Sequence, residues 1–319
     1  MMAQEKLPFV LVVMACYNGA EYLDEQLSSI LAQQGIRIAL LVRDDGSGDS
    51  TPEILADWQA RYPDQIELLE GQDNNLGAAG SFSLLLSTAL RKWQSGCDYA
   101  AIALADQDDI WLTNKLKLSL DALMRSAQGK PGDYPLLVHT DLRVVDKKGE
   151  KIAASLMQYQ GLDAGKRKFS SQLLSNTVTG CTAVCNKALL ELALPVPEQA
   201  MMHDWWLSLV ASAFGEIAYV NEPLIEYRQH GANTLGARKH SKPGWQRLKT
   251  LLSGHGASQE SGQAQQLFYQ SAEQAKAFRS RFAAQLTAKQ KKSLDRAERM
   301  PTLGRWQQRI LFRWQRWFE

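Results

Sequence analysis

The segment YAAIALADQDDIW, residues 99–111, decides the fold class of this chain. Its first half is a short apolar run, which is typical of a strand buried within a sheet. Its second half places Asp106, Asp108 and Asp109 directly after that run. A solvated turn would explain one such aspartate, because Asp is common where strands end. Three carboxylates in four positions repel one another, and this favours a site for Mg²⁺ or Mn²⁺.

Outward from this segment, strand-like and helix-like patterns alternate along the first half of the chain. The predicted strands are 9–15, 38–42, 66–70, 99–105, 136–140 and 144–146, and the predicted helices are 21–34, one from 51, 78–93 and 113–127. This alternation predicts an α/β fold with a mostly parallel sheet and helices on both faces. Farther on, we expect a helix over 203–214, a strand over 217–220, a loop over 227–231 and a helix over 265–286.

Polar residues follow three of the predicted strands. Tyr17 and Asn18 follow the first, Asp44 and Asp45 follow the second, and the aspartate cluster follows the fourth. Ligands of such sheets bind at the carboxyl ends of the strands, so the three groups should meet at one edge. Asp45 fits two interpretations equally well, a glycine-containing turn or a contact to a nucleobase or ribose.

Two motifs in the second half carry groups that could act in chemistry. In HDWW, residues 203–206, Asp204 is either a helix N-cap or a general base beside an acceptor platform of Trp205 and Trp206. His230 is either an ordinary loop histidine or a contact to a metal or phosphate. Cys181 and Cys185 have no second pair nearby, which favours small buried residues over a metal site.

Charge divides the chain into two parts. Residues 238–319 carry 17 basic and 5 acidic side chains, a net charge of +12, and residues 1–237 carry −10. In the last helix, TLGRWQQRILFRWQRWFE, Trp306, Trp314 and Trp317 lie on the face opposite the arginines, as in helices at a membrane interface. The acidic body offers no basic groove, so nucleic acid is not an expected partner. We see no leader peptide or spanning segment, and therefore expect a cytoplasmic protein peripheral to the inner face of the cell membrane.

The order and spacing of these motifs resemble the inverting glycosyltransferases of family 2. The resemblance covers about residues 9–236, and DQDDIW, HDWW and YRQHGANTLG are similar to the rhamnosyltransferase branch of surface-polysaccharide assembly. It implies a GT-A fold in residues 1–237, with a nucleotide-binding part over about 9–140, an acceptor part over about 141–237 and a helical tail from 238. The Gln-x-x-Arg-Trp motif of processive members is absent, which favours single-sugar addition.

The resemblance also assigns roles to residues. It implies that Asp204 is the catalytic base, that Trp205 and Trp206 contact the acceptor, and that Asp108 and His230 bind the metal. It implies a nucleotide-sugar site made of Ala15, Tyr17, Asn18, Asp45, Asp106 and Gln107. Many relatives carry Thr or Ser where this chain has Ala15, so a side-chain hydrogen bond is not expected there.

The function implied is transfer of one sugar, best matched by rhamnose from dTDP-rhamnose, to a hydroxyl of a lipid-linked glycan. UDP-galactose and UDP-glucose are alternative donors. A nucleotidyltransferase is a further alternative, although the loop from Ala15 to Gly19 lacks the basic, glycine-rich character such enzymes use. A non-catalytic scaffold at the membrane would explain the tail and leave the three polar clusters unexplained. The oligomeric state is not predicted.

Overall fold

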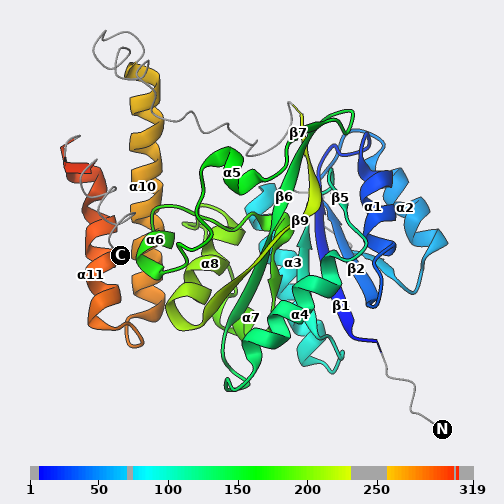
Figure 1. The fold of residues 1–319 in the computed structure, drawn as a ribbon, viewed down its shortest axis with the longest axis horizontal. Coiled ribbons are helices and arrows are strands. Elements are labelled where there is room, and N and C mark those ends of the chain that lie inside the picture. The colour runs from blue at the N-terminus through cyan, green and yellow to red at the C-terminus, as the bar shows by residue number, and fades with distance from the viewer. Residues whose placement is uncertain (1–6, 70–74, 231–256, 305–306, 309–319) are drawn as a thin grey trace.

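The computed structural model describes residues 7–69, 75–230, 257–304 and 307–308, and a mixed sheet runs through its centre (Figure 1). The strands are β1 (Phe9–Cys16), β2 (Arg37–Asp44), β3 (Ile66–Leu68), β4 (Ala101–Ala105), β5 (Ile110–Trp111), β6 (Leu136–Asp146), β7 (Lys151–Ala153), β8 (Val184–Cys185) and β9 (Glu216–Gln229). Their order is β3-β2-β1-β4-β8-β6-β9-β5, and β7 pairs with β6. β1 to β4 pair in parallel, as do β6 and β9, whereas β8 and β5 run antiparallel to their neighbours.

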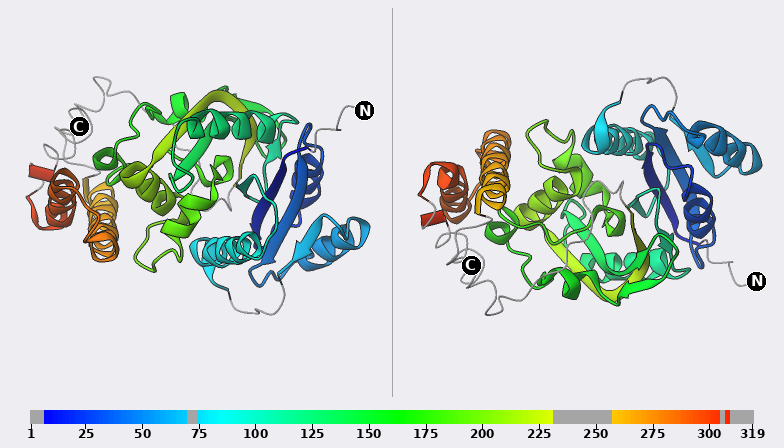
Figure 2. Two further views of the ribbon diagram at one scale, coloured as in Figure 1. Left: turned by 90° about the horizontal axis from the view of Figure 1, so that it is seen from below. Right: turned by 90° about the horizontal axis from the view of Figure 1, so that it is seen from above.

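Helices cover both faces of this sheet (Figure 2). The helices are α1 (Leu23–Leu31), α2 (Thr51–Arg61), α3 (Gly77–Gln94), α4 (Lys115–Ala127), α5 (Leu156–Gln160), α6 (Phe169–Gln172), α7 (Lys187–Ala193), α8 (His203–Phe214), α10 (Ala257–Phe282) and α11 (Ala288–Arg299). Alternate residues of β1 point to opposite faces, so Val10 and Val12 join one core, with α1, α2 and α4. Leu11 and Val13 join the other core, with α3, α7 and α8. The α/β fold and its two-sided helical cover are therefore confirmed.

The second half of the sheet differs from the sequence prediction. The two strands expected over 136–140 and 144–146 are one strand, β6, with a register shift near Asp141. β9 extends well beyond the predicted 217–220, so Tyr227, Arg228 and Gln229 are strand residues and not a loop. The physical reason lies in the tertiary structure. β6 supplies parallel main-chain hydrogen-bond partners along β9, and no local sequence pattern predicts this pairing.

The carboxyl ends of β1, β2 and β4 lie side by side, as predicted. Cys16 is in register with Asp44, Met14 is in register with Ala105, and the amide of Asp45 donates to the carbonyl of Cys16 over 2.8 Å. This register brings the polar residues that follow the three strands to one edge of the sheet.

The described tail forms a helical hairpin, α10 and α11, at the side of the body that carries α8 (Figure 1). Phe278 and Phe282 of α10 are buried, and their rings lie 5.5 and 6.2 Å from that of Trp206 on α8. The aromatic stripe of this helix thus packs on the α/β body of the chain. No helix within the described ranges has the length and apolar character needed to cross a membrane. Trp306, Trp314 and Trp317 lie outside the described residues.

Candidate active site

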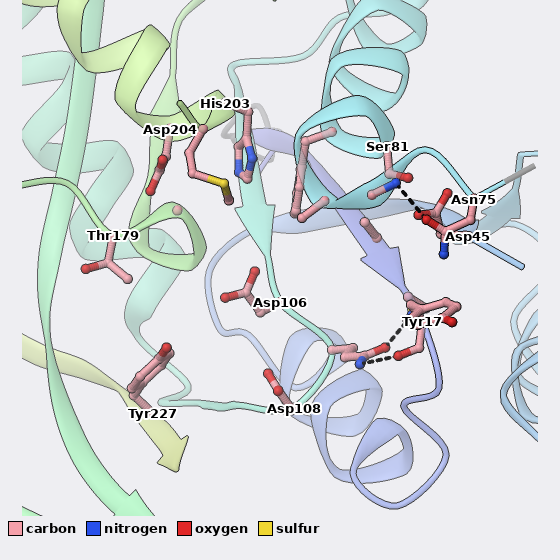
Figure 3. Close-up of a pocket in the computed structure, with 18 residues that line it drawn as sticks. Tyr17, Asp45, Asn75, Ser81, Asp106, Asp108, Thr179, His203, Asp204 and Tyr227 are labelled. Atoms are coloured by element: carbon pink, nitrogen blue, oxygen red, sulfur yellow. Dashed lines mark hydrogen bonds between the residues drawn. The ribbon is translucent and has the colours of Figure 1, made fainter. Parts of the chain in front are cut away.

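A pocket of about 440 Å³ opens at the sheet edge where the three polar clusters meet (Figure 3). Asp106, Asp108 and Asp204 point toward a common space, and Asp45 lies on the opposite side of the pocket with Tyr17, Asn75 and Ser81. Its lining contains the following residues: Ala15, Cys16, Tyr17, Asp45, Asn75, Gly77, Ala78, Ser81, Phe82, Asp106, Gln107, Asp108, Thr179, Gly180, Met202, His203, Asp204 and Tyr227. Residues from both halves of the chain therefore line one cavity.

Asp45 is fixed at one end of the pocket by a buried arginine. Arg43 Nη2 pairs with Asp45 Oδ1 over 3.0 Å, and the backbone amide of Leu76 donates to the same oxygen over 2.8 Å. Arg43 also donates from Nε to Ser81 Oγ over 3.2 Å. A buried carboxylate needs such partners, and here they orient Asp45 at the pocket wall rather than in a solvated turn.

Gln107 and Asn18 connect the loops that form the pocket floor. Gln107 accepts from the amide of Tyr17 and donates to its carbonyl, over 2.8 and 3.0 Å. A Cβ on Gly19 would lie 2.2 Å from Gln107 Oε1, so only glycine leaves room for this contact. Asn18 accepts from the amide of Gly48 over 2.8 Å and does not line the pocket. Asn18 therefore braces two loops, whereas half-exposed Tyr17 faces the cavity.

Asp108 and His230 come together from opposite ends of the domain sequence. His230 Nε2 lies 2.8 Å from Asp108 Oδ2, and the imidazole packs against the ring of Tyr22, tilted by 34° with 4.8 Å between centroids. Asp106 lies in the same wall, where burial, together with Asp108 and Asp204, raises the pKa of its carboxyl. The wall thus concentrates negative charge beside a nitrogen and an oxygen that could both ligate a hard divalent cation.

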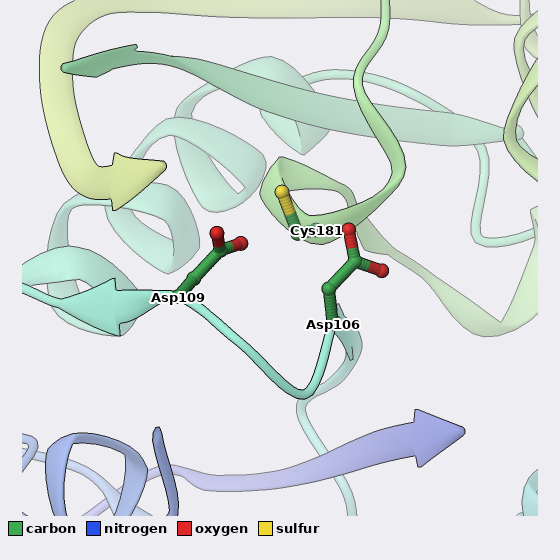
Figure 4. A group of neighbouring side chains, drawn as sticks. All are labelled: Asp106, Asp109 and Cys181. Atoms are coloured by element: carbon green, nitrogen blue, oxygen red, sulfur yellow. The ribbon is translucent and has the colours of Figure 1, made fainter. Parts of the chain in front are cut away.

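Asp109 has a different environment from the other two aspartates. It is fully buried, does not line the pocket, and lies with Asp106 and Cys181 in a group whose ligand atoms are all within 4.8 Å (Figure 4). Burial, together with Asp108 and Asp106, raises the pKa of the Asp109 carboxyl, and burial lowers the pKa of the neighbouring Lys115 ammonium to about 7. Burial therefore favours the neutral form of both groups, and Asp109 supports the loop from behind the pocket.

Asp204 occupies the first turn of α8 and faces the aspartate pair across the pocket (Figure 3). Burial raises the pKa of its carboxyl to about 6, and hydrogen bonds from Trp205, Gly180 and Asn176 oppose that shift. The amide of Trp205 donates to Asp204 Oδ1 over 2.6 Å. The helix N-cap is Met202, so the N-cap interpretation of Asp204 is wrong. A fixed carboxylate with this pKa is suited to accept a proton near neutral pH.

Trp206 does not contact the pocket, and its expected role in acceptor binding is wrong. Its side chain is fully buried, and Nε1 donates to the carbonyl of Ala193 over 2.8 Å. Successive helix residues point about 100° apart, so Trp206 is turned to the core when Asp204 faces the cavity. Trp205 also lies outside the pocket lining, with Nε1 donating to the carbonyl of Gln172.

Comparison with known proteins shows which activity the chain has. Residues 11–129 match the model of glycosyl transferase family 2. The chain is a glycosyltransferase. This glycosyltransferase is 29% identical over 245 residues to the dTDP-rhamnosyl transferase RfbG of Shigella flexneri, a match covering 74% of this chain and 78% of RfbG. It is 27% identical over 225 residues to the putative teichuronic acid biosynthesis glycosyltransferase TuaG of Bacillus subtilis, covering 69% of this chain and 79% of TuaG.

Solved structures assign the fold of this glycosyltransferase. Residues 1–349 of S. aureus TarS, in complex with UDP-GlcNAc, superpose with a TM-score of 0.53 at 14% identity, over 97% of this chain and 90% of the TarS chain. The mannosyltransferase PcManGT from Pyrobaculum calidifontis, in complex with GDP-Man and Mn²⁺, gives a TM-score of 0.51 at 16% identity, over 98% and 86%. The GT-A fold predicted from the motifs is confirmed.

Sequence reasoning missed several residues of this glycosyltransferase site. Gly180 lies in the segment NTVTGCT, residues 176–182, and a Cβ there would be 3.1 Å from His203 Nε2 and 3.5 Å from Asp204 Oδ2. His203 stacks on Phe82 at 4.0 Å, and burial lowers the pKa of its imidazole to about 3. The glycine in NTVTGCT was the available signal, although glycine alone does not distinguish a turn from a close approach.

Proposed function

We propose that this glycosyltransferase transfers one sugar with inversion, and that Asp204 is its catalytic base. The observation that carries the proposal is the placement of Asp204 across the cavity from Asp106 and Asp108, with Asp45 on the opposite side. A nucleotide sugar would lie with its base near Asp45 and Tyr17 and its diphosphate near Asp108. The sugar would then lie between the diphosphate and Asp204, where an acceptor hydroxyl can approach from the far side.

Asp108 and His230 would hold a divalent cation, Mg²⁺ or Mn²⁺. Adjacent ligand atoms in an octahedral site with bonds of about 2.1 Å lie about 3 Å apart. Asp108 Oδ2 and His230 Nε2 share a hydrogen bond over 2.8 Å, and a cation that replaced the shared proton would find both ligand atoms close to this spacing. When bound, such a cation offsets the charge of the diphosphate leaving group.

The reaction then follows from the placement of Asp204. Its carboxylate takes the proton of an acceptor hydroxyl, and the hydroxyl oxygen forms a bond to the anomeric carbon. The bond between that carbon and the diphosphate breaks, and its electron pair leaves with the diphosphate oxygen. Because attack and departure lie on opposite faces, the configuration inverts. A positioned base contributes typically 10²- to 10⁴-fold to such a step.

We infer that the donor is dTDP-rhamnose. The support is the similarity to RfbG, whose name states that activity, together with the motifs shared with that branch. UDP-galactose and UDP-glucose remain alternative donors, and TarS is a relative in fold whose structure contains UDP-GlcNAc. A donor panel with Mn²⁺ or Mg²⁺ tests this point: dTDP-rhamnose should give the largest rise in melting temperature and the fastest hydrolysis. Preference for a UDP-sugar would overturn the donor assignment and leave the reaction type intact.

The same assay separates this proposal from a nucleotidyltransferase. Glycosyl transfer releases a nucleoside diphosphate from the nucleotide sugar, whereas a nucleotidyltransferase would release pyrophosphate only in a parallel reaction supplied with a nucleoside triphosphate and a sugar phosphate. Binding of every nucleotide sugar without any turnover, in the presence of a lipid-linked glycan acceptor, would instead favour a scaffold.

We further propose that the tail associates with the inner face of the cell membrane, where a lipid-linked glycan acceptor would lie. Exposed Lys289, Lys292 and Arg299 on α11 support this, because each basic residue near an anionic surface adds about 1 kcal/mol of attraction. Deleting residues 309–319 leaves the described helices intact and should reduce co-sedimentation with anionic vesicles. Unchanged co-sedimentation would exclude residues 309–319, with Trp314 and Trp317, from membrane binding.

A further inference from the structure

Arg228, near the end of β9, lies behind the candidate metal pair. It precedes His230 by two positions and is 4% exposed. A buried guanidinium is costly unless its donors are used, so the partners of Arg228 show what this residue holds in place.

One set of partners belongs to the aspartate loop. Arg228 Nε donates to the carbonyl of Asp108 over 3.2 Å, and the backbone amide of Arg228 donates to Asp109 Oδ1 over 3.3 Å. Nη1 donates to the carbonyl of Lys147, in the turn between β6 and β7, over 3.1 Å. The loop that carries Asp108 is therefore tied to β9, the strand that leads into His230.

A second set of partners belongs to α1 and the residue before it. Arg228 Nη2 pairs with the carboxylate of Glu25, and the guanidinium lies over the ring of Tyr22 at 4.7 Å. The same ring also contacts His230, whose imidazole centroid is 4.8 Å away. Arg228 thus fixes the backbone of Asp108 directly and the aromatic support of His230 through Tyr22.

We propose that Arg228 is a positioning residue that sets the spacing between Asp108 and His230, and so tunes the affinity of this glycosyltransferase for its cation. This inference rests on the metal-binding role given to Asp108 and His230 under the proposed function. Arginine is required because its planar group presents donors in several directions at once, to the Asp108 carbonyl, the Lys147 carbonyl and Glu25. A lysine ammonium could keep the pair with Glu25 but could not reach all three.

An arginine that only stabilised the fold would respond differently to substitution from a positioning residue. Its replacement would lower the free energy of unfolding and leave the metal affinity of the folded protein unchanged. Loss of groups that orient metal ligands typically weakens metal affinity 10- to 100-fold. Metal affinity of the folded protein is therefore the measurement that distinguishes the two roles.

The test measures Mn²⁺ binding to the full chain by electron paramagnetic resonance, without any turnover, for the parent and for Arg228→Met, Arg228→Lys and Glu25→Gln. Arg143→Met is the matched control. Arg143 also pairs with a glutamate of β9, Glu226, over 2.7 Å, but lies away from the pocket lining. We expect 10- to 100-fold weaker Mn²⁺ binding for Arg228→Met, a smaller loss for Arg228→Lys and Glu25→Gln, and no change for Arg143→Met.

Two results would overturn the inference, and a third would reject the metal-binding role on which it rests. If Arg228→Met folds and binds Mn²⁺ like the parent, Arg228 has no positioning role. If Arg228→Met does not fold, Glu25→Gln decides, since Glu25 is largely exposed: unchanged Mn²⁺ affinity in that variant rejects the inference. If the parent itself binds no Mn²⁺, the proposed metal-binding role of Asp108 and His230 is rejected, whatever the result for Arg228. Saturating Mn²⁺ should also restore the kcat of Arg228→Met and leave that of Asp204→Asn low.

Discussion

Replacing Asp204 by asparagine should make the ligand-free protein more stable while it removes sugar transfer. Burial raises the pKa of this carboxyl from 3.8 to about 6. Each pKa unit corresponds to 1.36 kcal/mol, so the buried charge costs at most about 3 kcal/mol of stability at neutral pH. Asparagine has nearly the same shape and can still accept the hydrogen bond from the Trp205 amide, so it removes the charge with little repacking.

The gain in stability should depend on pH in a defined direction. The folded-state pKa lies above the unfolded one, so the cost of the ionised carboxylate is fully present above pH 6. That cost is small by pH 4 and disappears below the unfolded-state pKa of 3.8, where both states hold the proton. The variant should therefore exceed the parent in unfolding free energy at pH 7.5, and the difference should shrink to a small fraction at pH 4.

Urea unfolding in EDTA measures the stability difference, and EDTA keeps bound cations from masking it. Asp57→Asn on α2 is a suitable control because its carboxylate is 69% exposed, and its effect should stay within about 0.5 kcal/mol. In transfer assays, Asp204→Asn should lose about 10²- to 10⁴-fold in kcat, and the parent kcat should rise with pH through about 6. Equal or lower stability of the variant at pH 7.5 would refute the burial argument, and near-normal turnover would place the base elsewhere.

Three further predictions follow from contacts in the pocket and the tail. Asp108→Ala should abolish metal-dependent transfer, and near-normal turnover at any Mn²⁺ concentration would reject its assignment. Gly180→Ala should reduce kcat by about 10- to 100-fold with a small change in melting temperature, because its Cβ would lie 3.1 Å from Nε2 of His203, the neighbour of Asp204; an unchanged kcat would show that this contact is tolerated. Phe278→Ala should cost about 3–5 kcal/mol in urea unfolding, whereas a loss below 1 kcal/mol would mean that α10 contributes little to the core.

The local pattern of residues 9–127 was sufficient to predict strands β1 to β4, the helices that follow them and the sheet edge where the ligand site lies. Each strand there is a short apolar run ended by a polar cluster, and parallel pairing brings such ends together without further information. That is why Asp45 and Asp108 could be placed on one cavity before the structure was considered. Helical periodicity similarly placed Phe278 and Phe282 on one face of α10, although it did not say what that face would meet.

The contacts that complete the site depend on pairing between strands far apart in the chain, which no local sequence pattern predicts. β9 owes its length to pairing with β6, and this pairing brings Arg228 and His230 to Asp108, about 120 residues earlier in the chain. The orientation of α8 about its axis turns Trp206 to the core and Asp204 to the pocket. The residues of the HDWW motif do not by themselves predict that orientation. The sequence by itself therefore determined the fold class, the sheet edge and the acidic character of the site. Only the tertiary structure decided which of its polar groups face the ligand and which support them, because burial and distance are properties of packed elements and not of any single one.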